Sequence, residues 1–235
     1  MRESRRNMAR RSSDSPVRAK KPARRPAVAA GPDFSREAGL LADGKRFVAG
    51  IDEAGRGPLA GPVVTAAVIF PTRDFPDGLN DSKKLTAEDR ERLFAEIVAK
   101  GWVGIASASA DEIDRFNIRG ATLLAMRRAL HALPEAPCHV LVDGRDVPPA
   151  LRCAGTAVIS GDALSLSIAA ASIVAKVTRD RIMARACRAY EGYGFSRHMG
   201  YGTPEHLGAI ARLGPTPIHR MSFSPLRRDL LDAAE

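Results

Sequence analysis

The stretch from Phe47 to Pro62, FVAGIDEAGRGPLAGP, places two adjacent carboxylates between an apolar run and a glycine turn. The apolar run ends at Ile51, Asp52 and Glu53 follow it, and a β-branched run resumes after Pro62. Apolar runs separated by a segment rich in Gly and Pro predict two strands joined by a tight turn. Carboxylates at the end of a buried strand are costly to desolvate, so they predict a cation or another partner. Hard divalent cations such as Mg²⁺ bind oxygen ligands of this kind.

The order of the remaining elements predicts an α/β fold. Strand-like runs come first as a pair and later alternate with helical patterns, of which the longest is expected from Leu164 to about Tyr190. Such alternation is typical of a central mixed β-sheet flanked by helices. Thr203 followed by Pro204 predicts the start of a last helix, and hence a C-terminal helical part.

Basic residues are concentrated at the N-terminus. Residues 1–30 contribute +8 of the net charge of +9, and they contain almost no large apolar side chain. We therefore predict a disordered basic tail over residues 1–33 and a folded domain over residues 34–235. A functionless extension fits the tail equally well. The rest of the chain carries only +1, so binding to nucleic acid must depend on a local basic patch.

Several protein classes are excluded by composition. No apolar run approaches the ~20 residues of a membrane helix, so no membrane association is expected. The three cysteines form no CxxC motif, which favours a reducing compartment and predicts a cytoplasmic location. The five histidines lack the spacing of zinc ligands, which argues against a zinc site.

Four carboxylates follow strand-like runs in the same way. Asp143 and Asp162 each come at or just past the end of such a run, as Asp52 and Glu53 do. In open α/β sheets, ligands bind outside the carboxyl ends of the strands. Converging carboxylates would repel one another unless divalent cations compensated their charge, and two cations ~3.5–4 Å apart can promote phosphodiester displacement. Any single acid could equally be a turn former or a helix cap, but the four together favour catalysis.

The glycine turn Gly55-Arg56-Gly57 is followed by Pro58 and Gly61, which does not fit the spacing of a dinucleotide fingerprint. It favours close backbone approach to a sugar or phosphate, with a plain hairpin turn as the alternative.

Other basic and aromatic residues are candidates for contacts with nucleic acid. Lys83 and Lys84 could contact phosphates, although on these residues alone a solvated charge pair is favoured. Tyr201 lies among glycines and basic residues, which suits stacking on a base or ribose, and a packed aromatic is the alternative. Lys176 and Arg179 are predicted on a solvated face of the long helix.

Six motifs, in order along residues 45–225, resemble bacterial ribonuclease HII: IDEAGRGPLAGPVV, LNDSKKL, NIRGAT, VLVDG, SGD with IAAASIVAKVTRD, and HMGYGT. The resemblance implies a ribonuclease H-like catalytic domain over residues 34–235. It implies an endonuclease that uses Mg²⁺ or Mn²⁺ to hydrolyse the RNA strand of RNA–DNA hybrids, and to cut 5′ to single ribonucleotides in duplex DNA. Two-metal-ion catalysis would leave 3′-OH and 5′-phosphate ends. The expected partners are these nucleic acids, and a monomer is expected.

The resemblance also implies roles for individual residues. The metal-binding catalytic carboxylates would be Asp52, Glu53, Asp143 and Asp162. The substrate-binding residues would be Gly55, Arg56 and Gly57, whose backbone reads the ribose 2′-hydroxyl, Tyr201 under the sugar at the RNA–DNA junction, and Lys83 and Lys84 on the phosphates.

Three positions depart from the family pattern. Ser160, Met199 and Met221 each stand where a cation is frequent. We expect weaker contact with the nucleic-acid backbone or a compensating cation, for which Arg197, Arg220 and the tail are candidates.

Two other function classes remain open from the residues. A metal-dependent phosphotransferase or actin-like ATPase would turn over nucleotides without nucleic acid, although no second phosphate-binding glycine motif is present. A non-catalytic nucleic-acid-binding module would lose all affinity for hybrids on deletion of residues 1–33, whereas the enzyme would keep a metal-dependent cut.

Overall fold

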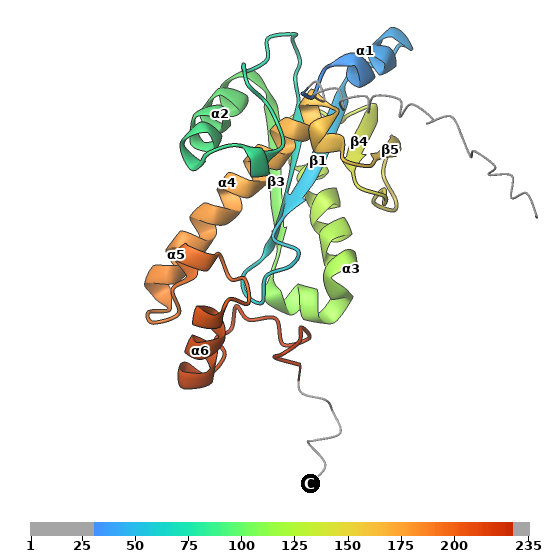
Figure 1. Cartoon of the computed structure of the whole chain (residues 1–235). Helices are drawn as coiled ribbons and strands as arrows, with labels where there is room; N and C mark the ends of the chain where they lie inside the picture. The colour runs from blue at the N-terminus through green and yellow to red at the C-terminus, as the bar shows by residue number, and fades with distance from the viewer. Residues whose placement is uncertain (1–30, 228–235) are drawn as a thin grey trace, which may run out of the picture. The chain divides into compact units, whose positions relative to one another are not determined.

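The strand that carries Asp52 and Glu53, β1 (Val48–Ala54), lies at the centre of a five-stranded sheet (Figure 1). The computed structural model describes residues 31–227. The strand order is β3-β2-β1-β4-β5, in which β2 (Val63–Ile69) is antiparallel to both β1 and β3 (Trp102–Ala108). On the other side of β1, β4 (His139–Asp143) and β5 (Ala154–Val158) run parallel to it. The predicted α/β class with a mixed sheet is confirmed.

Helices cover both faces of the sheet (Figure 1). The helix α4 packs on β1 and β2 with α2 beside it, and α3 packs on β2 and β3 from the opposite face. The helices are α1 (Ser35–Ala42), α2 (Ala87–Lys100), α3 (Ala110–His131), α4 (Leu166–Ala189), α5 (Phe195–His198) and α6 (Pro204–Leu213), with single 3₁₀ turns η1 (Ser82–Lys84) and η2 (Gly161–Ala163). Within residues 31–227, no helix is long and apolar enough to cross a membrane.

Burial on two faces explains the sequence of β2, VVTAAVI, which is apolar apart from one threonine. Ala66 and Val68 belong to the cluster under α2 and α4, and Ala67 and Ile69 belong to the cluster under α3. Successive side chains point to opposite faces of a strand, and both faces are covered, so β2 cannot show the alternation of a half-exposed strand.

The backbone of α4 comes unusually close to β1. A Cβ atom at Gly50 would lie 2.2 Å from the carbonyl carbon of Ser167, in the first turn of α4. The start of α4 is also bound to α1, because Ser167 donates to Glu37 Oε1 from its amide at 2.9 Å and from its hydroxyl at 2.6 Å. These contacts place the N-terminus of α4, and the η2 turn before it, beside the central strands.

The pattern around Ser109 predicts a short helix, followed by a second and longer one. In the structure the two form α3, which is interrupted at Asn117, a residue with φ 57° and ψ 167°. The Asn117 side chain accepts a hydrogen bond from the Gly120 amide at 3.0 Å and so caps the second half.

Candidate active site at the carboxyl ends of the central strands

The four predicted carboxylates come from three neighbouring segments. Asp52 and Glu53 lie near the end of β1, and Asp143 is the last residue of β4, which is parallel to β1 with Ile51 opposite Val142. Asp162 lies in η2, and the Gly161 amide donates to Asp143 Oδ1 at 2.7 Å. The parallel register thus brings the ends of β1 and β4 to one edge, and this hydrogen bond joins η2 to them.

The pKa values of Asp52, Glu53 and Asp162 show that these groups are affected by neighbouring charges. Burial raises the pKa of Asp52 well above its ordinary value, and the charges of Glu53 and Asp143 raise it further. Burial also raises the pKa of Glu53, although Arg56 opposes the shift, and burial and Asp143 raise the pKa of Asp162. A carboxyl group whose pKa is raised in this way is poised to bind a cation.

Lys83 lies close enough to the four carboxylates, called the acidic edge below, for their charges to act on it. Burial alone would lower the pKa of Lys83, but Asp81, Asp162, Asp52 and Asp143 raise it overall. The η1 turn that carries Lys83 is attached to α4 through a hydrogen bond of 2.8 Å between the buried hydroxyls of Ser82 and Ser172. Lys83 and Lys84 both have exposed side chains. Of these two exposed lysines, Lys83 is the one on which the charges of the acids act.

The glycine turn lies directly beside the acids. Arg56 is half-exposed and forms an ion pair of 3.3 Å with Glu53. Gly55 has φ +93°, a conformation that glycine adopts without strain. A Cβ atom at Gly57 would lie 3.6 Å from the ring of Tyr201, which is 49% exposed. The turn and the exposed tyrosine are thus adjacent, whereas Tyr193 is packed in the core as a structural aromatic.

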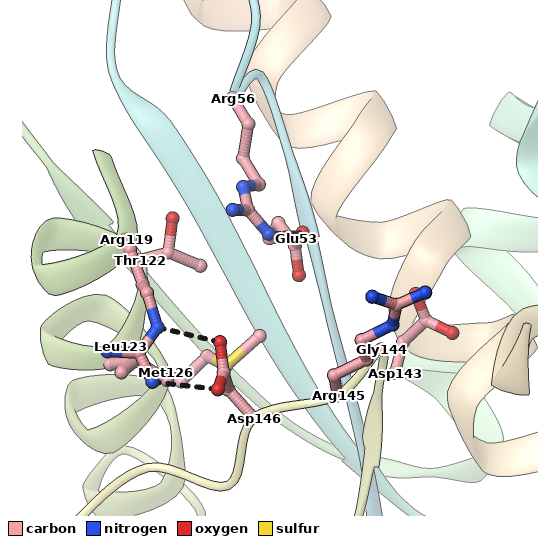
Figure 2. A pocket seen from close by; sticks show the side chains of 10 residues that line it. All are labelled: Glu53, Arg56, Arg119, Thr122, Leu123, Met126, Asp143, Gly144, Arg145 and Asp146. Carbon is pink, nitrogen blue, oxygen red and sulfur yellow. Dashed lines mark hydrogen bonds and ion pairs between the residues drawn. The ribbon is translucent and has the colours of Figure 1, made fainter. Parts of the chain in front are cut away.

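A pocket of about 110 Å³ opens between the acids and α3 (Figure 2). Glu53 and Asp143 line one side, and Arg119 of α3 lines the other. Arg119 forms a bidentate ion pair with Asp146, at 2.9 and 2.7 Å, in the segment after β4. The NIRGAT motif therefore supplies a contact that links α3 to the end of β4, a role that its spacing alone did not reveal.

The family model described as Ribonuclease HII matches residues 49–225. The chain belongs to the ribonuclease HII family. A Ribonuclease HII of Rhizobium leguminosarum bv. trifolii is 58% identical over 197 residues, which cover 84% of this chain and 86% of that protein. This family member is therefore an enzyme, an endoribonuclease that acts on RNA–DNA hybrids.

Solved structures show the same fold. The ribonuclease H2 from Pyrococcus horikoshii has a TM-score of 0.63 and 28% identity, and the match covers 77% of this chain and 95% of that one. A Bst RNase HIII solved in complex with Mn²⁺ has a TM-score of 0.56 and 20% identity, with 80% of this chain and 70% of that one covered. The predicted ribonuclease H-like fold is confirmed, and divalent metal use is consistent with the family.

The prediction of a solvated face at Lys176 and Arg179 is wrong for the arginine. Lys176 forms an ion pair of 2.6 Å with Asp180, but Arg179 is only 1% exposed. Its guanidinium donates to the backbone carbonyls of Pro62, Ala60 and Met199. In the sequence Arg179 lies among Lys176, Asp180 and Arg181, so no local signal distinguished it from the charged residues around it.

Arg220 cannot replace the missing cations in the way the sequence suggested. It is fully buried and donates only to backbone carbonyls of the connection between β1 and β2. Arg197 is exposed and forms an ion pair with Glu205. The third candidate is the basic tail, and its residues 1–30 lie outside the part of the chain that the structure describes. Ser160 and Met199 both adopt left-handed backbone conformations, and Met221 is 40% exposed.

Three buried histidines lie together, and two of them, His206 and His219, are joined by a hydrogen bond that the sequence spacing did not reveal. The Thr216 amide donates to Nδ1 of His219 at 2.8 Å, so the proton of His219 lies on Nε2. That nitrogen is 3.0 Å from Nε2 of His206, which must accept and therefore carries its own proton on Nδ1, 2.9 Å from the carbonyl of Tyr201. His198 stacks on His206 with ring centroids 4.5 Å apart. These hydrogen bonds require the rings of both His206 and His219 to be neutral. Through the bond to its carbonyl, they also fix the backbone of Tyr201.

We expect the free energy of unfolding to fall as the pH is lowered from about 6.5 to about 4. Burial lowers the pKa of His219 from 6.5 to about 4, and burial and His198 lower the pKa of His206. Between these limits the unfolded chain binds more protons than the folded one, so stability is present above pH 6.5 and is lost on acidification. Each pKa unit corresponds to ~1.4 kcal/mol, so His219 alone accounts for at most about 3 kcal/mol.

Urea unfolding at a series of pH values measures this loss. The raised pKa values of Asp52, Glu53 and Asp162 make the folded state more stable as the pH falls, which opposes the effect of the histidines. The wild type is therefore compared with a His219→Gln variant, which keeps these carboxylates. The variant should be less stable at neutral pH and should show a flatter dependence between pH 6.5 and 4. If the free energy of unfolding depended on pH equally in the two proteins, the predicted contribution of His219 would be wrong.

Proposed function

We propose that this enzyme cuts 5′ to single ribonucleotides embedded in duplex DNA, as well as in the RNA strand of hybrids, and leaves 3′-OH and 5′-phosphate ends. The observation that carries the proposal is the position of the glycine turn. Arg56 contacts Glu53 of the acidic edge, and Gly57, one residue on, lies against the exposed ring of Tyr201. A backbone turn and an aromatic platform therefore adjoin the carboxylates that would act on the neighbouring phosphodiester.

Recognition through this turn would not depend on the base. The 2′-hydroxyl is the group that distinguishes RNA from DNA at a given site. Backbone amides can bind it whatever the base, and Tyr201 offers a flat apolar surface to the sugar. Lys83 and Lys84 would contact the phosphates, which position a strand without reading its sequence. We therefore expect little sequence preference.

The four carboxylates fit Mg²⁺ or Mn²⁺, because the donor set consists of oxygens alone. Among residues 31–227, no three side chains of His, Cys, Asp or Glu are arranged to enclose an ion, so water and substrate oxygens would complete the coordination. Asp52, Glu53, Asp143 and Asp162 would hold the ions. When bound, the ions would activate the attacking water and stabilise the leaving 3′ oxygen. The buried Asp52 and the half-buried Asp143 would fix this assembly to the ends of the central strands, and Lys83 would offset part of the remaining charge.

One chain supplies every residue of this site, so we propose that a monomer is active. The cytoplasmic location expected from the sparse cysteines stays a prediction.

Three duplexes of one sequence test the proposed function: all DNA, DNA with one ribonucleotide, and an RNA–DNA hybrid. With Mg²⁺ or Mn²⁺, we expect a single cut 5′ to the lone ribonucleotide, multiple cuts in the RNA strand, and no cut in all-DNA duplex. A DNA polymerase should extend the upstream product, because it ends in 3′-OH. Cleavage of the all-DNA duplex, or a cut on the 3′ side of the ribonucleotide, would contradict the proposal, as would nucleotide hydrolysis without nucleic acid.

A further inference from the structure

A buried guanidinium lies behind the glycine turn. Arg220 follows α6, is 0% exposed, and forms no ion pair with a carboxylate in the part of the chain that the structure describes. Its Nη2 donates to the carbonyl of Gly55 at 2.6 Å and its Nη1 to the carbonyl of Arg56 at 2.8 Å. Its Nε and Nη2 also donate to the carbonyl of Gly61, at 3.0 and 2.8 Å. An unpaired buried charge is costly, so this arrangement needs every one of these carbonyls to point inwards.

Those contacts determine where the amides of the turn point. Within residues 31–227 the only cis peptide bond is Ser224-Pro225, so the peptide units of the turn are trans. In a trans unit the C=O and N–H groups point in opposite directions. The carbonyls of Gly55 and Arg56 face Arg220, so the N–H groups of the same two units, on Arg56 and Gly57, face away from it.

These two N–H groups are free to bind a substrate. No hydrogen-bond acceptor contacts the amide of Arg56 or Gly57 among the described residues. The turn adjoins Glu53 on one side and the ring of Tyr201 on the other. A carbonyl that accepts from a cation is polarised, and hydrogen bonds in series strengthen one another, so the N–H of the same peptide unit becomes a better donor.

We infer that Arg220 is a positioning residue, which aims the amides of Arg56 and Gly57 at the 2′-oxygen of the substrate and strengthens them as donors. The inference rests on the proposed function of the turn. It explains why a charged residue is buried here without a carboxylate: a salt bridge would have occupied the donors that hold the two carbonyls. An apolar residue of similar size would leave the same carbonyls unpaired and the turn free to rotate its peptide units.

Arg179 provides a matched control. It too is buried, and it donates to the carbonyls of Ala60 and Pro62 in the same connection, at 3.2 and 3.1 Å. Neither carbonyl belongs to the two peptide units whose amides face away from Arg220. Arg179 also packs against Gly55, where a Cβ atom would lie 1.9 Å from its Nε, so Arg179→Lys controls for a general loosening of the connection while the carbonyls of Gly55 and Arg56 stay bound to Arg220.

Arg220→Lys and Arg179→Lys are compared by their kcat/KM on the single-ribonucleotide duplex and by the inhibition constant of the all-DNA duplex as competitor. Lysine keeps the charge but cannot bridge three carbonyls. For Arg220→Lys we expect kcat/KM to fall about tenfold or more, the effect of one lost hydrogen bond, with the inhibition constant unchanged. For Arg179→Lys both values should stay within about threefold. Equal kcat/KM for Arg220→Lys and wild type, or an equal loss of affinity for all-DNA duplex, would overturn the inference.

Amide exchange in the wild-type protein gives a test that needs no variant to fold. In the free protein, the Arg56 and Gly57 amides should exchange rapidly with water, and the single-ribonucleotide duplex should protect them more than the all-DNA duplex does. Protection already present in the free protein would show that the amides point inwards and would overturn the inference. If the wild type does not distinguish the two duplexes in cleavage, the proposed function itself fails. If the wild type distinguishes the two duplexes and Arg220→Lys cleaves as well as the wild type, only the proposed role of Arg220 fails.

Discussion

Asp52→Asn is expected to lower kcat on the single-ribonucleotide duplex by about 1000-fold or more, because several kcal/mol of metal-dependent stabilisation of the transition state would be lost. Asp52 is 5% exposed at the end of the central strand, and both Glu53 and Asp143 act on its pKa. Single-turnover cleavage with saturating Mg²⁺ or Mn²⁺ measures the chemical step. Asp74→Asn is the control, since Asp74 is exposed and contacts Lys100 on the surface.

The same variant should not lose stability. A carboxyl group with a raised pKa in the folded state destabilises that state at neutral pH, and asparagine removes the charge. In the absence of divalent ions, the Tm of Asp52→Asn should therefore equal or exceed that of the wild type. Addition of Mg²⁺ or Mn²⁺ should raise the Tm of the wild type but not that of the variant, because only the wild type gains binding energy. Full activity in Asp52→Asn, or a Tm drop that explains its inactivity, would refute the assignment.

Gly50→Ala is expected to destabilise the protein by about 3 kcal/mol or more, which overpacking against a rigid neighbour can cost. The new Cβ would lie 2.2 Å from the Ser167 carbonyl carbon and 2.3 Å from the Ile168 amide nitrogen. Both atoms are backbone of α4, which is bound to Glu37 and packed on the sheet, so neither can move without shifting the helix. For a chain of this length, the Tm should fall by about 10 °C.

Gly39→Ala is the matched control for this substitution. Gly39 lies inside α1, and a Cβ atom there would have no neighbour within 4 Å. Alanine is favoured over glycine in a helix by roughly 0.5–1 kcal/mol, so Gly39→Ala should be neutral or slightly stabilising. A Gly50→Ala protein as stable as Gly39→Ala would show that β1 and α4 do not approach as closely as the structure has them.

Local patterns predicted much of the fold. The paired apolar runs around Asp52 and Glu53 became β1 and β2, and Thr203 with Pro204 became the start of α6, where Thr203 caps the helix through the amide of His206. These features depend on neighbours in the sequence, so periodicity and capping residues identify them. The connection between β1, which ends at Ala54, and β2, which begins at Val63, is longer than the predicted tight turn, and two buried arginines from distant segments hold its carbonyls.

The sequence by itself determined the fold class and the family of this protein. Acids at the ends of apolar runs, a glycine turn and ordered motifs were enough to predict an α/β nuclease and its carboxylates, because strand ends and turns are local properties. Only the tertiary structure decided the partners of Arg179, Arg220, His206 and His219. A charged or titratable residue looks the same in sequence whether it is solvated or buried. Its environment depends on residues outside its own local pattern, 13 positions away between His206 and His219 and 165 positions away between Arg220 and Gly55. Those contacts orient the turn that the sequence could only locate.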